Sequence, residues 1–209
     1  MKKFLLFVSA TLLCTGIASA NIIPSLIGSP SLLGSGLYQW NYQMALDGSE
    51  RLDPAASNSA TACSGVPCVP PGTFFTIYDF VGFQAVVGTP ASWTSSTQFT
   101  GVTPASTAPI PADNPAVINV TFTYTGPVVN GPITQSGFNL TSLYGGQTQG
   151  AYAQQATNNT ASILNGQTDR GAGPLSVPMA VSGVPEPASM MLIGAGLVGL
   201  AAFRRKFVR

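Results

Sequence analysis

Carboxylates are the side chains in the central part of this 209-residue chain that are best suited to acid–base catalysis. Two carboxylates held about 5 to 10 Å apart can hydrolyse a glycosidic bond, one as acid and the other as base or nucleophile. Five acids are candidates for such a pair: Asp47, Glu50, Asp53, Asp79 and Asp113. A carboxylate-dependent glycosidase is therefore the enzymatic activity that the composition leaves open, as a remote alternative.

Whole residue types are missing, and their absence excludes most other mechanisms. The chain has no histidine, which removes Ser-His-Asp and Cys-His catalysis and imidazole metal sites. The only lysines are Lys2, Lys3 and Lys206, close to the two ends of the sequence, so a Ser-Lys dyad in the central part is excluded as well. We therefore expect no enzymatic activity, no cofactor and no metal site.

Three of the acids lie within seven residues, from Asp47 to Asp53. Calcium prefers oxygen ligands, and extracellular calcium sites can be weak. The spacing does not match a calcium-binding loop, however, and Arg51 lies among the acids as a candidate ion-pair partner. We therefore favour a turn with Gly48 at its bend, and a calcium site is the alternative.

Cys63 and Cys68 are separated by four residues. In an oxidising compartment two cysteines this close are expected to form a disulfide. A redox-active pair is one alternative, although the spacing is not Cys-x-x-Cys. A metal site is the other, although two thiolates without a histidine do not make a usual zinc set. The prediction is a disulfide.

Aromatic side chains suggest a second function, a carbohydrate-binding module. Trp40, Tyr42 and Trp93 could form a platform on which sugar rings stack. In a half-buried strand such residues more often belong to the core, because their large apolar surface favours burial. The hypothesis therefore requires that Trp40 and Trp93 be exposed.

Hydroxyl-bearing residues are abundant, with 35 Ser or Thr in residues 21–183. Three Asn-x-Thr acceptor patterns begin at Asn119, Asn139 and Asn158. In so Ser/Thr-rich a sequence such patterns arise mostly by chance, so they do not by themselves predict glycosylation.

Hydrophobic periodicity predicts strands in the central part of the chain. Residues 38–46 and 118–124 alternate apolar and polar side chains with period two, as half-buried strands do. Residues 74–83 are apolar on both faces, which predicts a central strand. Asp79 within that run either bonds to a neighbouring strand or marks a bend beside Gly82. Weaker strand candidates are residues 91–99, 133–143 and 175–181.

Turn residues separate these segments, and no fixed repeat is visible. Residues 103–115 contain several prolines, and residues 151–164 could form one short helix despite an Asn-rich centre. The Ser/Thr-rich segments after Gly145 are expected to be mobile. Short strands between turns predict a mainly β fold, an antiparallel sandwich-like domain with Pro/Gly-rich loops.

The first 20 residues have the pattern of a secretory signal peptide. Lys2 and Lys3 precede an apolar stretch over residues 4–17. Ala18 and Ala20 fit the small-residue positions of a signal peptidase site, so Asn21 is expected to be the first mature residue. Cys14 would suggest a lipoprotein instead, but large Leu13 precedes it. We therefore predict cleavage rather than a permanent anchor or lipidation.

The C-terminal residues 184–209 show a second ordered pattern. Pro185, Glu186 and Pro187 precede residues 188–203, which carry no charge and are followed by Arg204, Arg205 and Lys206. Sixteen residues span roughly 24 Å as a helix, which is short of the ~30 Å hydrocarbon core. Basic side chains can extend the span by reaching the headgroups. A short transmembrane helix over residues 188–203 is therefore expected.

This order of acidic motif, apolar helix and basic end resembles the PEP-CTERM sorting signal that exosortases read in Gram-negative bacteria. The resemblance implies that Pro185, Glu186 and Pro187 are the sorting motif and that Arg204, Arg205 and Lys206 are the stop signal. It also implies cleavage near the motif by exosortase, which would remove the helix. An ordinary membrane anchor is the alternative, but it needs no Pro-Glu-Pro.

Charge supports an exported central part, because six of the eight basic residues lie in the two terminal segments. Residues 21–183 carry two basic and six acidic side chains, a net charge of about −4. Basic ends stay on the cytoplasmic side of the membrane, and nucleic-acid binding is not expected of so acidic a body. We expect three parts: a signal peptide (1–20), an exported β-rich domain (21–183) and a sorting segment (184–209).

The functional hypothesis is a surface or extracellular-matrix structural protein. Signal peptidase, exosortase and, before processing, the membrane are its expected partners. A structural association with exopolysaccharide or biofilm is expected at its destination.

Overall fold

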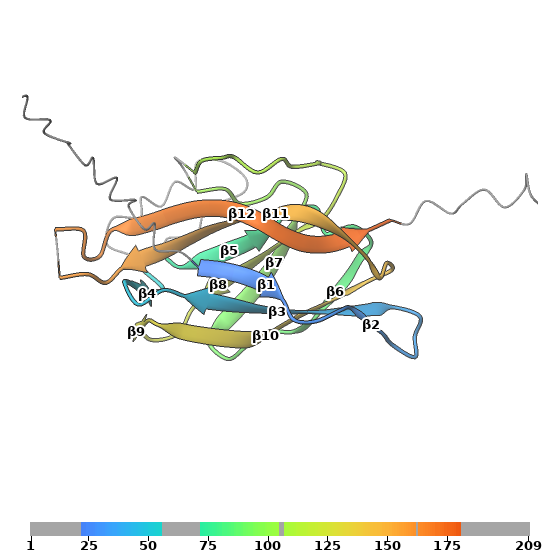
Figure 1. Cartoon of the computed structure of the whole chain (residues 1–209), viewed down its shortest axis with the longest axis horizontal. Helices are drawn as coiled ribbons and strands as arrows, with labels where there is room; N and C mark the ends of the chain where they lie inside the picture. The colour runs from blue at the N-terminus through green and yellow to red at the C-terminus, as the bar shows by residue number, and fades with distance from the viewer. Residues whose placement is uncertain (1–21, 56–71, 105–106, 162, 181–209) are drawn as a thin grey trace, which may run out of the picture.

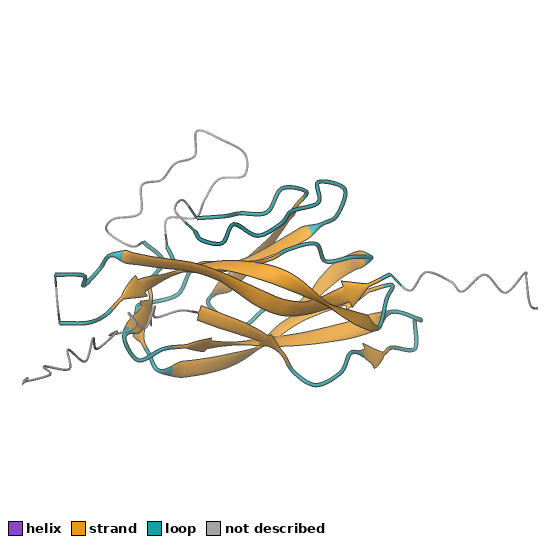
Figure 2. Cartoon of the chain, turned by 45° about the horizontal axis from the view of Figure 1, so that its top comes forward, coloured by secondary structure: helices purple, strands orange, loops and turns teal. Residues whose placement is uncertain are grey.

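A computed structural model describes residues 22–55, 72–104, 107–161 and 163–180. Within these ranges the chain forms twelve strands and no helix. Figure 2 shows the strands in orange and the loops between them in teal. Every strand pairing is antiparallel. The mainly β, antiparallel class predicted from the sequence is confirmed. The expected signal peptide, disulfide and sorting segment lie outside the described residues.

The first sheet is built around β3 (Tyr38–Leu46). On one side β3 pairs along its whole length with β10 (Ile133–Ser142), and β6 (Phe83–Gly88) lies beyond it. On the other side it pairs with β1 (Ile22–Leu26) and β2 (Ser31–Leu32). The observed bounds of β3 are those predicted from its alternation.

The second sheet is built around β11 (Gly146–Asn158). One side of β11 pairs with β12 (Thr168–Met179). The other side pairs first with β5 (Phe74–Ile77) and then with β4 (Glu50–Leu52). Outside β5 lie β8 and β7, and β9 pairs with β4; their bounds are β8 Asn119–Tyr124, β7 Trp93–Gln98 and β9 Val129–Asn130.

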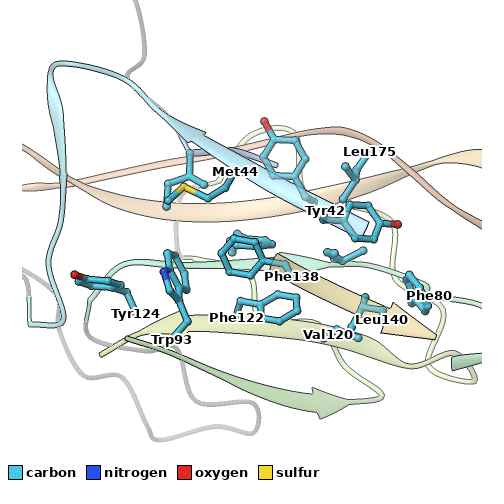
Figure 3. Packing of buried hydrophobic residues seen from close by; sticks show 14 of the residues in the cluster. Tyr42, Met44, Phe80, Trp93, Val120, Phe122, Tyr124, Phe138, Leu140 and Leu175 are labelled. Carbon is cyan, nitrogen blue, oxygen red and sulfur yellow. The ribbon is translucent and has the colours of Figure 1, made fainter. Parts of the chain in front are cut away.

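The core lies between the two sheets and is rich in aromatic rings (Figure 3). Phe138 of β10 packs edge-on against Phe75, Phe122 and Trp93 of the opposite sheet, with ring centroids 5.0 to 5.1 Å apart. Edge-to-face pairs add about 0.5 to 1.5 kcal/mol beyond the area they bury. Phe138 therefore joins the two sheets near the centre of the sandwich.

One strand prediction is wrong in its second half. Residues 74–83 do not form a single strand, because β5 ends at Ile77 and the chain turns before β6. Asp79 has a φ of 51° and Gly82 a φ of 68°, both in the left-handed region that strands do not use. The chain therefore bends at Asp79, which was one of the two interpretations of this residue from the sequence. The bend connects a strand of the second sheet to a strand of the first.

The prediction of a short helix over residues 151–164 is wrong, and so is that of mobile segments after Gly145. Most of this region belongs to β11, which pairs with β12 in unbroken register from Gly146 with Met179 to Thr157 with Thr168. Consecutive residues near the end of β11 are buried on both faces. The sequence of such a strand does not alternate apolar and polar residues. Its Ala and Gln residues also have high helix propensity, which is why the sequence suggested a helix.

Candidate functional sites

The acidic segment between β3 and β4 is a turn, as its sequence predicted. Asp47 Oδ1 accepts hydrogen bonds from the backbone nitrogen of Ser49 at 2.9 Å and from its Oγ at 2.8 Å. These bonds, the backbone bond first, lower the pKa of the Asp47 carboxyl. Arg51 and Asp53 form an ion pair at 3.0 Å. Across the described ranges no group of three or more acids, cysteines or histidines is placed to hold a metal ion.

Glu50 is the unusual member of this segment. Its side chain is fully buried, and neither carboxyl oxygen has a hydrogen-bond partner within the described part of the chain. Burial first, and then the negative charges of Asp169 and Asp47, raise the pKa of Glu50 to about 8, while Arg51 opposes the shift. This shift favours the protonated carboxyl at neutral pH. Its alternation with buried Leu52 along β4 was the sequence signal that it faces inward.

Asp79 and Asp113 hold a long loop against the second sheet. Asp79 Oδ1 accepts a hydrogen bond from the backbone nitrogen of Asn114 at 2.9 Å. Asp113 accepts one from the backbone nitrogen of Gly101 at 2.8 Å and another from Asn119 Nδ2 at 2.9 Å. Burial, followed by the charge of Asp113, raises the pKa of Asp79, and the bond from Asn114 opposes this. Both acids thus have a structural role.

A groove of about 670 Å³ lies beside Asp79, between the loop and β11–β12. Its walls are mostly small or apolar, and they include Ile110, Gly150 and Pro174. Among the described residues that line the groove, Asp79 is the single acid. This surface could accept an extended chain, but it does not bring two carboxylates together.

The aromatic platform predicted from Trp40, Tyr42 and Trp93 does not form, because all three side chains are buried. Trp40 Nε1 donates to the carbonyl oxygen of Tyr144 at 3.0 Å, and Trp93 Nε1 donates to Gln135 Oε1 at 2.8 Å. The polar atoms of both indoles are thereby satisfied inside the fold. The carbohydrate-binding hypothesis loses the residues on which it depended.

The asparagines of the three Asn-x-Thr patterns lie in the fold rather than on open loops. Asn119 is fully buried, and its Oδ1 accepts from the backbone nitrogen of Asp79 at 2.8 Å. Asn158 is buried as well, and its Oδ1 accepts from the Thr160 backbone. Asn139 is half-buried in β10. Asn119 and Asn158 are therefore unsuited to glycosylation in the folded domain.

The functional signal of the chain comes just after the last strand. β12 ends at Met179, which pairs with Gly146 at the start of β11. The folded domain thus ends a few residues before the proline-bracketed motif, which lies outside the described residues. No helix in the described ranges is long and apolar enough to span a membrane.

A mainly β domain followed by a C-terminal signal is the arrangement of an exported protein that carries its own sorting sequence. Residues 183–206 match the family model of the PEP-CTERM protein-sorting motif. The chain therefore carries this motif, as the resemblance of its C-terminal residues predicted. No protein among the curated ones matches the chain.

The motif implies export, a membrane-anchored stage and processing by exosortase. The individual roles of Pro185, Glu186 and Pro187, and of Arg204, Arg205 and Lys206, stay predictions. So do the signal-peptide site at Ala18, Ala20 and Asn21, the disulfide between Cys63 and Cys68, and the boundaries of the three parts.

Proposed function

We propose that the folded domain is a non-catalytic structural protein of the cell surface or extracellular matrix. In this proposal exosortase processes the precursor, and the folded domain is then located in exopolysaccharide or biofilm. The observation that carries the proposal is the sorting motif at residues 183–206, which begins four positions after the end of β12. The C-terminal segment acts as the sorting signal, and the β-sandwich is the part of the protein that is sorted.

The contacts of the acidic residues support a non-catalytic role. Asp79 and Asp113 bind loop backbone, Asp47 caps a turn, and Asp53 pairs with Arg51. Glu50 has the raised pKa that a general acid needs, but its side chain is buried away from any polysaccharide. A glycosidase would need two accessible carboxyl groups on opposite sides of a sugar.

Surface composition is compatible with a hydrated polysaccharide matrix. Only eight of the 209 residues are basic and seven acidic, and residues 21–183 are rich in Ser and Thr. Hydroxyl groups can exchange hydrogen bonds with sugars and water without a strong electrostatic field. The remaining association would be weak and distributed, with no single binding site.

The experiment is fractionation of producing cells with an antibody to the folded domain. The wild-type protein is expected in the surface or matrix fraction, and a variant with Pro185, Glu186 and Pro187 all changed to alanine is expected in the membrane fraction. A variant with Glu50 changed to glutamine is the matched control, because it also alters a glutamate but should be sorted normally. Equal amounts of the triple-alanine variant and the wild type in the matrix would contradict the proposal.

A further inference from the structure

The edge strands of the two sheets differ in how well they are protected from pairing with another strand. An edge strand presents backbone N–H and C=O groups that could bind a further chain, and proteins usually block them with proline, bulges or very short strands. β2 and β9 have two residues each, and the register of β6 with β10 shifts twice. These three strands are therefore poor templates for a further strand.

The edge formed by β12 is blocked by proline. The carbonyl oxygen of Ser176 accepts a hydrogen bond from Tyr42 Oη at 2.8 Å, so Ser176 and its alternate neighbours direct their backbone groups away from β11. Pro174 and Pro178 occupy two of these outward positions and have no N–H to donate. β12 also lies beside β1 of the first sheet (Figure 1), and β1 itself carries Pro24. This side of the sandwich therefore offers few free donors.

β7 is the edge strand of the described ranges that has no such protection. It pairs with β8 on one side, in a register without shifts, and with no other strand of the described residues. Its six residues include no proline and no charged side chain. Thr94, Ser95, Ser96 and Thr97 are all exposed. The outer edge of β7 is thus neutral, regular and open to solvent.

Two residues of β7 direct their backbone groups to this open side. Thr125 N donates a hydrogen bond to Ser92 O at 2.8 Å, so Ser92 and the alternate residues after it face β8. Ser95 and Thr97 therefore face away from β8, each with one N–H and one C=O. None of these four groups has a hydrogen-bond partner among the described residues. They are free to pair with another strand.

We propose that two copies of the chain pair through β7 in antiparallel orientation, about a two-fold axis that passes beside Ser96. In this register Ser95 lies opposite Thr97 of the second copy, so each copy donates two backbone hydrogen bonds and all four free groups are satisfied. The second sheet then continues from one copy into the other. The proposal concerns self-association, and it does not depend on where the domain is finally located.

The composition of β7 favours a second copy as the partner. A two-fold axis places the same surface on both sides of the contact, so a charge on the strand would lie close to its own like charge. β7 carries no charge, and its Ser and Thr side chains can exchange hydrogen bonds across the pair. Two paired six-residue strands form a small contact beside the roughly 800 Å² per partner of a standard interface. The dimer is therefore expected to be reversible.

Cysteine cross-linking of the full-length chain in detergent tests this register. The two copies of Ser96 would form a non-hydrogen-bonded pair with Cα atoms about 4.5 Å apart, a separation that a disulfide can span. Thr94→Cys is the matched control for Ser96→Cys, because Thr94 is also exposed on β7 but its two copies would lie roughly 14 Å apart. Since that distance is too long for a disulfide, we expect about ten-fold more covalent dimer from Ser96→Cys under mild oxidation. The wild type measures the background from the native cysteines.

Ser95→Pro tests the backbone hydrogen bonds without an added cysteine. Proline at this position removes an N–H that β8 does not use, so the fold should be kept while the dimer loses a donor from each copy. Ser95→Ala retains the N–H and is the control. Sedimentation of the detergent-solubilised chains should show a concentration-dependent dimer for the wild type and Ser95→Ala, and a monomer for Ser95→Pro. Denaturant unfolding reports whether Ser95→Pro is folded.

Equal cross-linking of Ser96→Cys and Thr94→Cys would overturn the proposal, because random collisions do not select a register. A folded Ser95→Pro chain that stays dimeric would overturn it too, and so would a wild type that is monomeric at every concentration. Ser96→Cys that cross-links in producing cells to a different protein, and not to itself, would assign the edge to another partner and overturn the second copy. The cross-linking comparison decides the proposal even where Ser95→Pro fails to fold.

Discussion

Gly146 and Met179 are paired where β11 begins and β12 ends, so the last residue of β12 lies opposite the first residue of β11. An added Cβ on Gly146 would lie 3.3 Å from the carbonyl oxygen of Met179. β12 is held by β11 in unbroken register from Thr168 to Met179.

The first prediction concerns Phe138, the ring that joins the two sheets. Phe138→Ala would remove contacts with Phe75, Phe122 and Trp93. We expect a loss of about 3 to 5 kcal/mol in the free energy of unfolding, since a buried cavity would remain. Denaturant unfolding of the purified protein measures it. Ile163→Ala, at an exposed position, should change stability by less than about 0.5 kcal/mol, and a similar loss in both variants would contradict the packing.

The second prediction concerns Glu50 and pH. In the folded protein Glu50 has a pKa of about 8, against 4.5 for an ordinary glutamate. Between these values the folded state binds more protons than the unfolded state, so the contribution of Glu50 to stability is full below pH 4.5 and falls as pH rises to 8. The ceiling is about 1.4 kcal/mol per pH unit.

Glu50→Gln should therefore match the wild type near pH 4.5 and exceed it in stability at pH 8. Denaturant unfolding at both pH values measures the difference. Asp47→Asn is the control, because the lowered pKa of Asp47 gives a contribution that is lost on acidification, the opposite direction. Parallel pH profiles for wild type and Glu50→Gln would show that the carboxyl is not shifted.

The third prediction concerns the bend at Asp79, whose φ is 51°. Asp79→Val should destabilise the protein by about 2 to 3 kcal/mol, because a β-branched residue is strained in the left-handed region and the bond to Asn114 is lost. Asp79→Asn tolerates this conformation and keeps the acceptor oxygen, so it should be nearly neutral. Thermal unfolding compares the two. Equal melting temperatures for both variants would argue against the bend.

Much of the fold could be predicted where a strand has one buried and one exposed face. β3 alternates buried Trp40, Tyr42 and Met44 with half-buried polar residues, so its period is visible in the sequence. The sequence of β11 does not show this alternation, because Ala153 to Ala156 are all buried. The turn at Asp79 was hidden for a different reason, since only the φ values distinguish a bend from a continuous apolar strand.

The candidate sites also differ in how far the sequence alone could predict them. The sorting motif is local in sequence, so its residues could be recognised without a structure. The burial of Trp40 and Trp93 depends on the facing sheet, and their alternation fits both a core and a platform. The positions of the strand ends depend on pairings such as Leu32 with Tyr38 and Gly146 with Met179. The second of these joins residues more than thirty positions apart, which no local pattern indicates.

The central claim is that the C-terminal segment delivers the domain and is then removed. Intact-mass analysis of surface-exposed protein from producing cells tests it most directly. We predict a mass that corresponds to a chain ending near Pro185–Pro187, without the apolar segment and without Arg209. Surface-exposed protein that retains Arg209 would contradict processing at the motif.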